Sequence, residues 1–267
     1  MALAAQQLQL HIDDVTLLRD VSLSVPAGEV TAILGPNGAG KTSLLRVMSG
    51  ALKPDRGTVH MGEQPLAEWD SRARATTLAM LPQHSTLNFP FTVEEVVMLG
   101  RTPHRTGASR DREVVRCALD SVDLLNLARR SYMHLSGGEK QRVQLARVLT
   151  QIWRDDADSG ERDAGQSRGE RFLLLDEPTA SFDLAHQAMT HMIVRRLAQE
   201  GVGVLMVLHD LNLAARCADQ IVLMADATIQ ASGDPASVLT PDTIRGVFGV
   251  DVILATHPAT GAPLVVA

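Results

Sequence analysis

The 267-residue sequence has few aromatic residues and no surplus of positive charge. Phe, Trp and Tyr make up 3% of it, and 25 Lys and Arg stand against 31 Asp and Glu, for a formal net charge of -6. Nucleic-acid binding depends on basic surfaces and on aromatic side chains that stack on bases. We therefore expect no nucleic-acid partner.

Cysteine is also scarce, and long apolar runs are missing. The two cysteines, Cys117 and Cys217, have no C-x-x-C neighbour, which indicates a reducing compartment without a disulfide framework. The apolar run Val202 to Leu208 is far shorter than the roughly 20 residues of a spanning helix. Residues 1–14 show no signal-peptide pattern. We expect a cytoplasmic chain that meets the membrane through a partner.

The sequence does contain a series of short runs rich in Leu and β-branched residues, mostly without polar alternation. Strands that are buried on both faces have this pattern, which predicts a largely parallel sheet in an α/β fold. The runs are Val30 to Leu34, Leu78 to Leu81, Phe172 to Leu175, Val202 to Leu208 and Ile221 to Met224. Between them, the helical spacing of Met189, Met192, Ile193 and Leu197 favours core packing over a ligand site.

Two regions interrupt the alternation of strands and helices. Residues 84–150 show helical periods without a strand pattern, and we interpret them as a helical subdomain inserted into a core formed by 1–83 and 151–267. The segment 154–171 is almost wholly polar, which predicts a surface insertion. We expect residues 1–267 to form one domain.

The strand predicted at Val30 to Leu34 leads into a glycine-rich loop that matches G-x-x-x-x-G-K-[ST]. Glycines allow backbone N–H groups to curl around phosphate oxygens, and the N-terminus of the following helix adds partial positive charge. In this motif Lys41 reaches the β- and γ-phosphates, and the Thr42 hydroxyl can ligate Mg²⁺. The predicted nucleotide-binding residues of this loop are Gly35, Pro36, Asn37, Gly38, Ala39, Gly40, Lys41, Thr42 and Ser43.

Two carboxylates follow another predicted strand. Asp176 and Glu177 end the run Phe172 to Leu175, at the sheet edge where α/β folds bind ligands. Asp176 is predicted to hold Mg²⁺, and Glu177 to accept a proton from the attacking water. Such a pair is also typical of an ordinary solvated strand end, and the glycine-rich loop in the same chain favours the catalytic interpretation.

The segment Leu135 to Glu139 precedes a helical pattern and supports two interpretations. Ser136 and Glu139 have the spacing of an N-terminal capping box. Ser136, Gly137 and Gly138 at a helix N-terminus also suit an anion. Both can hold together.

With these three motifs in this order, the chain resembles the ATP-binding subunits of ABC transporters over nearly its full length. The resemblance implies a P-loop NTPase fold with a mainly parallel core sheet, an N-terminal antiparallel β subdomain and an inserted helical subdomain. It implies that ATP and Mg²⁺ bind, with Thr42, Gln83 and Asp176 at the metal and Glu177 and His209 as catalytic residues. In a homodimer, Ser136, Gly137, Gly138 and Glu139 would complete the ATP site of the other copy, and Asp183 would lie in the loop that crosses the interface.

The chain departs from the family pattern at several positions. Members commonly stack adenine on an aromatic residue before the P-loop, whereas this chain has no Phe, Trp or Tyr before Gly35. Leu10 falls nearest that position, and we expect weaker adenine contact or a contact from His11. Glu139 stands where Gln is frequent. The usual Asp-Gly turn of the C-terminal hairpin is Asp226-Ala227, at a small local cost.

The segment from residue 84 to 97, with Gly100 to His104 after it, resembles the importer ATPases that serve haem uptake in Gram-negative bacteria. That resemblance implies a subunit on the cytoplasmic face of the inner membrane, bound to a polytopic permease dimer and served by a periplasmic binding protein, without itself binding haem. Import of ferric siderophore or cobalamin is the alternative, and a soluble assembly ATPase is a more distant one. Arg101, Arg105, Arg110 and Arg112 predict either a basic rim or an ordinary solvated face.

Overall fold

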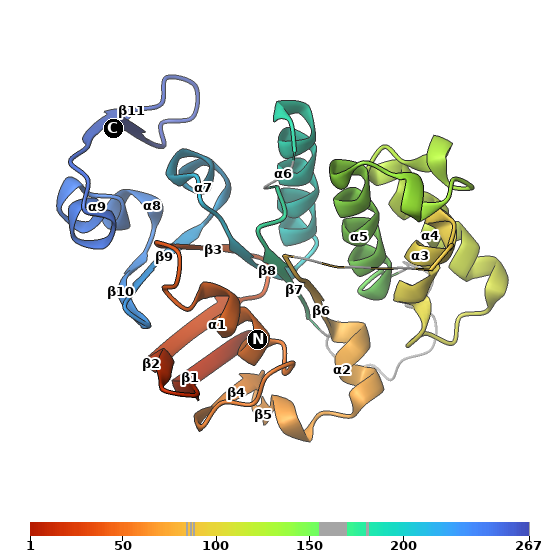
Figure 1. The fold of residues 1–267 in the computed structure, drawn as a ribbon, viewed down its shortest axis with the longest axis horizontal. Helices are drawn as coiled ribbons and strands as arrows, with labels where there is room; N and C mark the ends of the chain where they lie inside the picture. The colour runs from red at the N-terminus through yellow and green to blue at the C-terminus, as the bar shows by residue number, and fades with distance from the viewer. Residues whose placement is uncertain (84, 86, 88, 155–169, 180–181, 267) are drawn as a thin grey trace.

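The computed structural model describes residues 1–83, 85, 87, 89–154, 170–179 and 182–266. Its central sheet has six strands in the order β10-β9-β3-β8-β7-β6 (Figure 1). These are β3 (Val30–Leu34), β6 (Leu78–Leu81), β7 (Arg171–Asp176), β8 (Val202–Val207), β9 (Gln220–Ala225) and β10 (Thr228–Gly233). All neighbours in this order pair in parallel except β9 and β10, which are antiparallel. The predicted parallel sheet is therefore confirmed.

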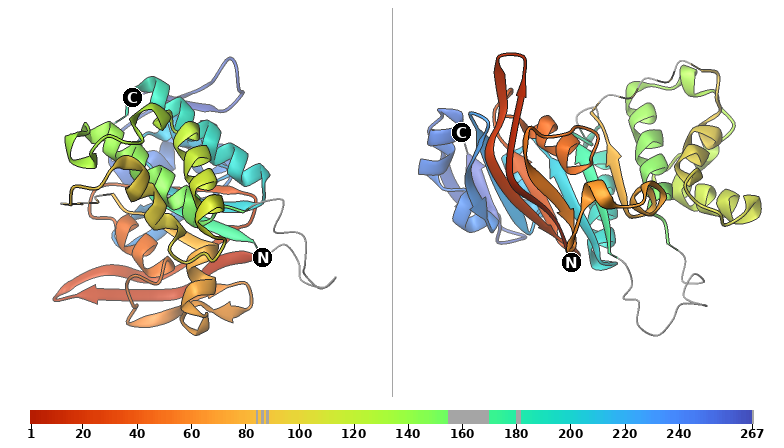
Figure 2. Two further views of the ribbon diagram at one scale, coloured as in Figure 1. Left: turned by 90° about the vertical axis from the view of Figure 1, so that its right-hand side faces the viewer. Right: turned by 90° about the horizontal axis from the view of Figure 1, so that it is seen from below.

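The central strands bury both faces, and their side chains alternate between two cores. In β3, Ala32 and Leu34 contribute to one core while Ile33 contributes to the other. The first core is covered by α5 (Gly137–Gln151), α6 (Leu184–Gln199) and α7 (Leu211–Cys217), and the second by α1 (Lys41–Met48) and a separate antiparallel sheet (Figure 2). This double burial explains why the strands lack polar alternation in the sequence.

The antiparallel sheet has the strand order β2-β1-β4-β5. Its strands are β1 (Ala2–Ile12), β2 (Val15–Pro26), β4 (Arg56–Met61) and β5 (Gln64–Pro65), followed by the 3-10 turn η1 (Leu66–Glu68) and α2 (Ser71–Thr77). Leu3, Leu8 and Leu18 from its long hairpin are fully buried against α1 and the central sheet. The N-terminal antiparallel β region that the family resemblance implied is present.

Helices occupy the region between β6 and β7. They are α3 (Val93–Met98), η2 (Leu99–Arg101), α4 (Ala108–Ser121), η3 (Leu125–Leu127), η4 (Tyr132–His134) and α5. Val96, Val115 and Leu145 belong to the same buried cluster as Ala32 of the central sheet, so this helical region shares a continuous core with the strands. The division of the chain at residues 84 and 150 stays a prediction, and residues 155–169 of the predicted polar insertion lie outside the described residues.

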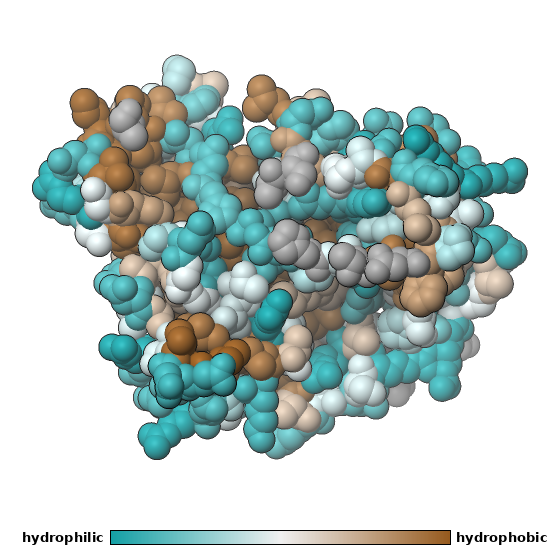
Figure 3. Space-filling view, viewed as in Figure 1, coloured by the Kyte–Doolittle hydropathy of each residue, from teal (hydrophilic) through white to brown (hydrophobic). Residues whose placement is uncertain are grey.

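The C-terminal elements are α8 (Pro235–Val238), α9 (Pro241–Phe248), β11 (Ile253–Thr256) and β12 (Pro263–Val266). The β11–β12 hairpin is attached to α7 through Asn212, whose Nδ2 donates to Val265 O at 3.0 Å and whose Oδ1 accepts from Val265 N at 2.7 Å. Apolar surface gathers at the upper left of Figure 3, where Figure 1 places β11. Ile253 of β11 is 73% exposed. None of the helices within the described ranges is long and apolar enough to cross a membrane.

Two sequence-based expectations fail at single side chains. Arg101 is not part of a basic rim, because its guanidinium is buried and donates to Asp111 Oδ1 at 2.8 Å and to Thr150 O at 3.0 Å. It therefore ties the start of α4 to the end of α5. Met192 does not pack in the core but is 67% exposed, since it turns away from the face of α6 that buries Ile193.

The turn between β9 and β10 has two central residues, Asp226 and Ala227, both with positive φ, as a type I′ hairpin turn requires. Aspartate tolerates this region, whereas alanine does so at a cost of roughly 1 kcal/mol. The carbonyl of Ala227 accepts from Arg19 N at 2.8 Å, so contact with β2 holds the turn in place.

Replacing Ala227 with glycine should raise the free energy of unfolding by roughly 0.5–1 kcal/mol, because glycine adopts positive φ without a steric penalty. Urea denaturation of the purified variant measures the change. Ala231→Gly in strand β10 is the matched control, and it should instead lower stability by a similar amount. Equal destabilisation by both substitutions would contradict the assignment of strain to Ala227.

Candidate active site

Four predicted groups meet at one edge of the central sheet because β3, β6, β7 and β8 run parallel and end there. The loop that starts at Gly35 follows β3, and Gln83 follows β6. Asp176 ends β7 with Glu177 after it, and His209 lies two residues past β8. Residues that are far apart in the chain are therefore brought to a common site by topology alone.

Glycine is required in the loop after β3. The backbone of Gly35, Gly38 and Gly40 has positive φ. A Cβ atom on Gly35 would lie 2.1 Å from Met224 O, and one on Gly40 would lie 2.3 Å from Leu17 O. The loop therefore packs its backbone directly against β9 and β2. The predicted residues on its outer side, Asn37 and Gly38, are exposed, while Ser43 is half-buried in the first turn of α1.

Lys41, the first residue of α1, closes the loop from inside. Its Nζ donates to Gly35 O and to Pro36 O, both at 2.8 Å, and the side chain is buried. Burial lowers the pKa of Lys41, while the nearby charges of Glu177 and Asp176 act in the opposite direction. The ammonium group is therefore held at the positive end of a helix, where anions bind.

Asp176 is 1% exposed, and only one of its two carboxylate oxygens has a hydrogen-bond partner among the described residues. Its Oδ1 accepts from Thr42 Oγ1 at 3.2 Å, and its buried Oδ2 has no hydrogen-bond partner among the described residues. Burial raises the pKa of this carboxyl. An orphaned carboxylate oxygen beside a hydroxyl suits a hard divalent cation, which prefers oxygen ligands. The residues present therefore fit the Mg²⁺ that the sequence predicts here.

The side chain of Glu177 joins two residues that were predicted separately. Its Oε2 accepts from Gln83 Nε2 at 2.7 Å, and its Oε1 lies 2.6 Å from His209 Nε2. The carboxylate is mostly buried, whereas Gln83 and His209 remain exposed. The arrangement presents one carboxylate, oriented by two neighbours, close to Asp176 and Lys41.

The segment from Ser136 to Glu139 lies elsewhere in the chain. The predicted capping box is confirmed: Ser136 Oγ accepts from Glu139 N at 3.3 Å, and Ser136 N donates to Glu139 Oε2 at 2.7 Å. The same bonds lower the pKa of Glu139. Gly137 is exposed and Gly138 half-buried. Among the described residues, the hydrogen bonds of the Ser136 and Glu139 side chains stay within this cap and do not reach Lys41 or Thr42.

Asp183 is likewise apart from the loop after β3. It caps α6 by accepting from His186 N at 2.9 Å, and His186 Nδ1 lies 2.7 Å from the same oxygen. Its side chain is exposed. The role of Asp183 at an interface stays a prediction.

The expected adenine contact stays a prediction. Leu10, which falls nearest the position of the missing aromatic, is 3% exposed and lies in the second core, so it offers no contact in its place. His11 is half exposed, and its Nδ1 lies 3.1 Å from Asp55 Oδ2. Beyond it, the tip of the β1–β2 hairpin presents Ile12 and Val15, which sequence reasoning did not single out.

Gln141 is a further residue that sequence reasoning missed. Its Nε2 donates to the backbone carbonyl of Glu177 at 2.9 Å, across from α5 to the end of β7. No spacing rule connects two residues that are 36 positions apart, so only the folded structure reveals the contact.

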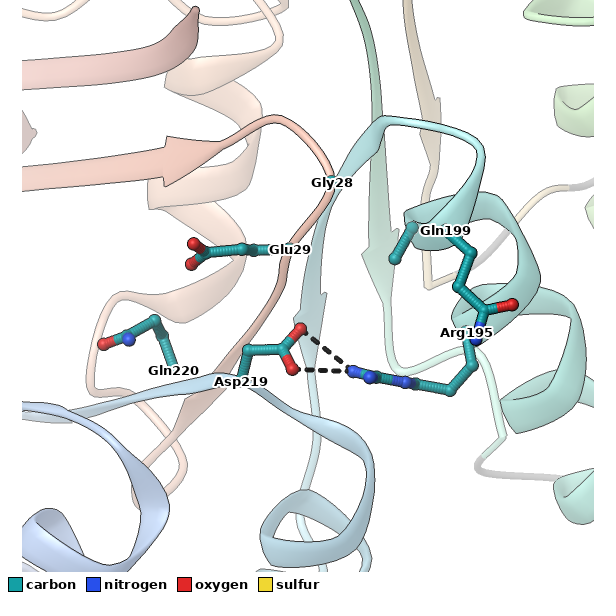
Figure 4. A pocket seen from close by; sticks show the side chains of 7 residues that line it. Gly28, Glu29, Arg195, Gln199, Asp219 and Gln220 are labelled. Atoms are coloured by element: carbon teal, nitrogen blue, oxygen red, sulfur yellow. Dashed lines mark hydrogen bonds and ion pairs between the residues drawn. The ribbon is translucent and has the colours of Figure 1, made fainter.

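A pocket of about 250 Å³ lies at the opposite edge of the sheet, where β3 and β9 begin (Figure 4). Its lining includes Arg195 and Asp219, which pair at 2.8 Å. Asp219 Oδ2 also accepts from Val30 N at 2.8 Å, so both charged groups have structural partners. This pocket is remote from Glu177 and His209 and does not mark the candidate site.

Comparison with known proteins supports the family resemblance found in the sequence. Residues 18–152 match the family described as "ABC transporter". The chain is 49% identical over 250 residues to the "Hemin import ATP-binding protein HmuV" of Pseudomonas putida, covering 94% of this chain and 93% of that protein. The protein of the same name from Photobacterium damselae is 42% identical over 267 residues, covering 100% and 96%.

Solved structures of the same fold include an ATP binding subunit of an ABC transporter, with a TM-score of 0.74 at 23% identity, covering 94% of this chain and 95% of that one. Another is MJ0796, a bacterial ABC transporter cassette described as dimeric, with a TM-score of 0.75 at 23% identity, covering 87% and 98%. These likenesses support the fold.

Replacing Asp176 with asparagine should stabilise the ligand-free protein by roughly 1 kcal/mol near pH 7, because it removes a buried charge with an unpaired oxygen. Folding raises the pKa of Asp176, so the folded chain holds that proton more tightly than the unfolded chain, and wild-type stability falls as pH rises through this range. The advantage of the variant should therefore be larger at about pH 7 than at about pH 4.

Urea denaturation with a chelator present, at both pH values, measures this difference. Asp55→Asn is the matched control, because hydrogen bonds from His11 lower the pKa of Asp55. Its stabilising contribution is present at neutral pH and is lost as pH falls, so the control should show the opposite pH trend. A pH-independent effect of Asp176→Asn would contradict the account.

Proposed function

The chain belongs to the ABC transporter family of ATPases, and from that premise we propose that its ATP hydrolysis powers the import of haem through a membrane permease. One observation carries the catalytic part of the proposal: Glu177 is oriented by Gln83 and His209 beside the loop that holds Lys41. Relatives that share 42–49% identity over nearly the whole chain and are named hemin import ATP-binding proteins support haem as the cargo.

We assign the phosphates of ATP to the loop from Gly35 to Ser43. The exposed outer side of the loop offers backbone N–H groups, and Lys41 can exchange its bonds to Gly35 O and Pro36 O for phosphate oxygens. Thr42, Asp176 and Gln83 would hold Mg²⁺. When bound, the cation neutralises charge that develops on the phosphate oxygens.

We assign Glu177 as the general base. Its carboxylate accepts a proton from water as the water oxygen bonds to the γ-phosphorus, and the bond from that phosphorus to the bridging oxygen breaks to leave ADP and phosphate. Gln83 and His209 hold the two carboxylate oxygens, so the base is aimed before the reaction begins.

The site within one chain is incomplete, which supports a dimer. Ser136 to Glu139 form an exposed helix N-terminus that does not contact the loop of its own chain, although such a terminus suits a phosphate. We propose that two copies sandwich two ATP molecules, with Ser136 to Glu139 of each copy completing the site of the other. Asp183 would then lie at the interface.

We propose that the segment after Gln83 receives the permease on the cytoplasmic face of the inner membrane. Phe89 is 63% exposed, and its ring lies 6.0 Å from that of Phe91, which packs against the first core. An exposed aromatic that lies beside a half-buried one suits the docking of an apolar partner helix. Because the same segment begins at Gln83, docking and nucleotide state would be linked. In the full system a periplasmic binding protein would deliver haem, which this chain need not touch.

Replacing Glu177 with glutamine should lower kcat by about 10²–10⁴-fold, because the amide cannot accept the proton. ATP binding should persist, so the variant should accumulate as an ATP-bound dimer. Phosphate release and size-exclusion chromatography with ATP measure the two effects. Glu200→Gln, an exposed carboxylate at the end of α6, is the control and should turn over normally. Normal turnover by Glu177→Gln would contradict the assignment of Glu177 as the base.

Deletion of the gene should abolish growth on haem as sole iron source while leaving growth on a ferric siderophore unchanged. Wild-type protein should restore growth, and the Glu177→Gln variant should not. Unimpaired growth on haem, in a strain without another haem importer, would remove haem as the cargo. Loss of growth on the siderophore alone would assign the chain to siderophore import, and purification with soluble partners alone would favour an assembly ATPase.

A further inference from the structure

The backbone of Glu177 is strained. Its φ is +51°, in the left-handed region that side chains with a Cβ rarely adopt, and the next residue is Pro178. A following proline further restricts the backbone of the residue before it. Such a conformation costs free energy and persists only where surrounding contacts determine it. The contacts of Glu177 therefore show which residues stabilise this backbone conformation.

Three contacts meet at this residue. Gln83 and His209 hold the carboxylate, while Gln141 holds the peptide group by donating from Nε2 to the Glu177 carbonyl at 2.9 Å. Gln83 and His209 come from exposed segments, whereas Gln141 lies in the second turn of α5 and is itself half-buried. The anchor of the carbonyl is thus the one contact that comes from a regular, packed element.

The position of Gln141 is well fixed. Helix α5 is capped at Ser136 and packs through Val143, Leu145 and Ala146, which are fully buried. The amide of Gln141 is not needed for these contacts, since a half-buried glutamine could be solvated. Its hydrogen bond crosses from the helix to the strand end at the site, which is where a small displacement changes catalysis most.

We propose that Gln141 is a positioning residue that fixes the strained peptide group of Glu177 and so aims the carboxylate at the attacking water. The inference rests on the proposed role of Glu177 as base. Because α5 also presents Ser136 to Glu139 at its N-terminus, the helix that would contact the partner's ATP also holds the base of its own site.

Gln141→Met tests the proposal, because it keeps the length of the side chain and removes the donor. Purified full-length protein should show kcat lowered by about 10-fold to 100-fold, with KM for ATP within about twofold of wild type. Gln141→Lys restores an N–H donor and should recover most of the lost kcat. Gln141→Glu, which has the same shape and no donor when ionised, should resemble Gln141→Met.

Gln144→Met is the matched control. Gln144 lies on the same helix, is more deeply buried and donates to the Tyr132 hydroxyl at 3.0 Å, away from Glu177. Its loss should lower the urea midpoint without lowering kcat. Wild-type kcat in both Gln141→Met and Gln141→Glu overturns the proposal, and so does an equal fall in kcat in Gln144→Met.

Glu177→Gln separates this inference from the proposed function. If that variant is inactive while Gln141→Met is fully active, the base stands and the positioning role is lost. If Glu177→Gln turns over normally, the assignment of Glu177 as the base is wrong, and the positioning role of Gln141 is wrong with it. Binding of a fluorescent ATP analogue to every variant shows that each one is folded.

Discussion

Every group of the site depends on one constraint, the parallel direction of β3, β6, β7 and β8. Parallel strands end at the same edge, so groups that are far apart in the sequence meet there. They are the loop after Leu34, the Gln83 amide, the Asp176 and Glu177 carboxylates and the His209 ring. Burial of both faces of these strands in two cores holds their ends in register. The core therefore sets where the strand ends lie and which residues meet at this edge.

Local features of this chain could be predicted from its sequence, because each depends on residues that are close together. The strand at Val30 to Leu34 and the cap formed by Ser136 and Glu139 are examples. Features set by tertiary packing could not. Arg101 looks like a surface charge until the carbonyl of Thr150 is found beside it, and Met192 has helical core spacing but lies past the edge of the covered face. The bond from Gln141 to Glu177 belongs to the same class, since nothing in the sequence pairs the two.

The site is made of groups that do not favour the stability of the chain by itself. Asp176 is buried, and its Oδ2 has no hydrogen-bond partner among the described residues. Glu177 adopts a strained backbone conformation. The Lys41 ammonium donates only to backbone carbonyls among the described residues. Each becomes favourable once cationic, phosphate or water partners are present. The surrounding structure, including the hydrogen bonds from Gln83 and Gln141, offsets the cost.

The two bonds from Lys41 to Gly35 O and Pro36 O also bear on the ATP binding that we propose for this loop. They hold the loop in its curled form, and packing of Gly35 against Met224 prevents it from opening inward. A phosphate group bound here would find the loop already in its curled form, so the loop would lose little conformational entropy on binding. Affinity for phosphate should then depend on the backbone N–H groups of the loop and on the exchange of carbonyl for phosphate oxygens around one ammonium group.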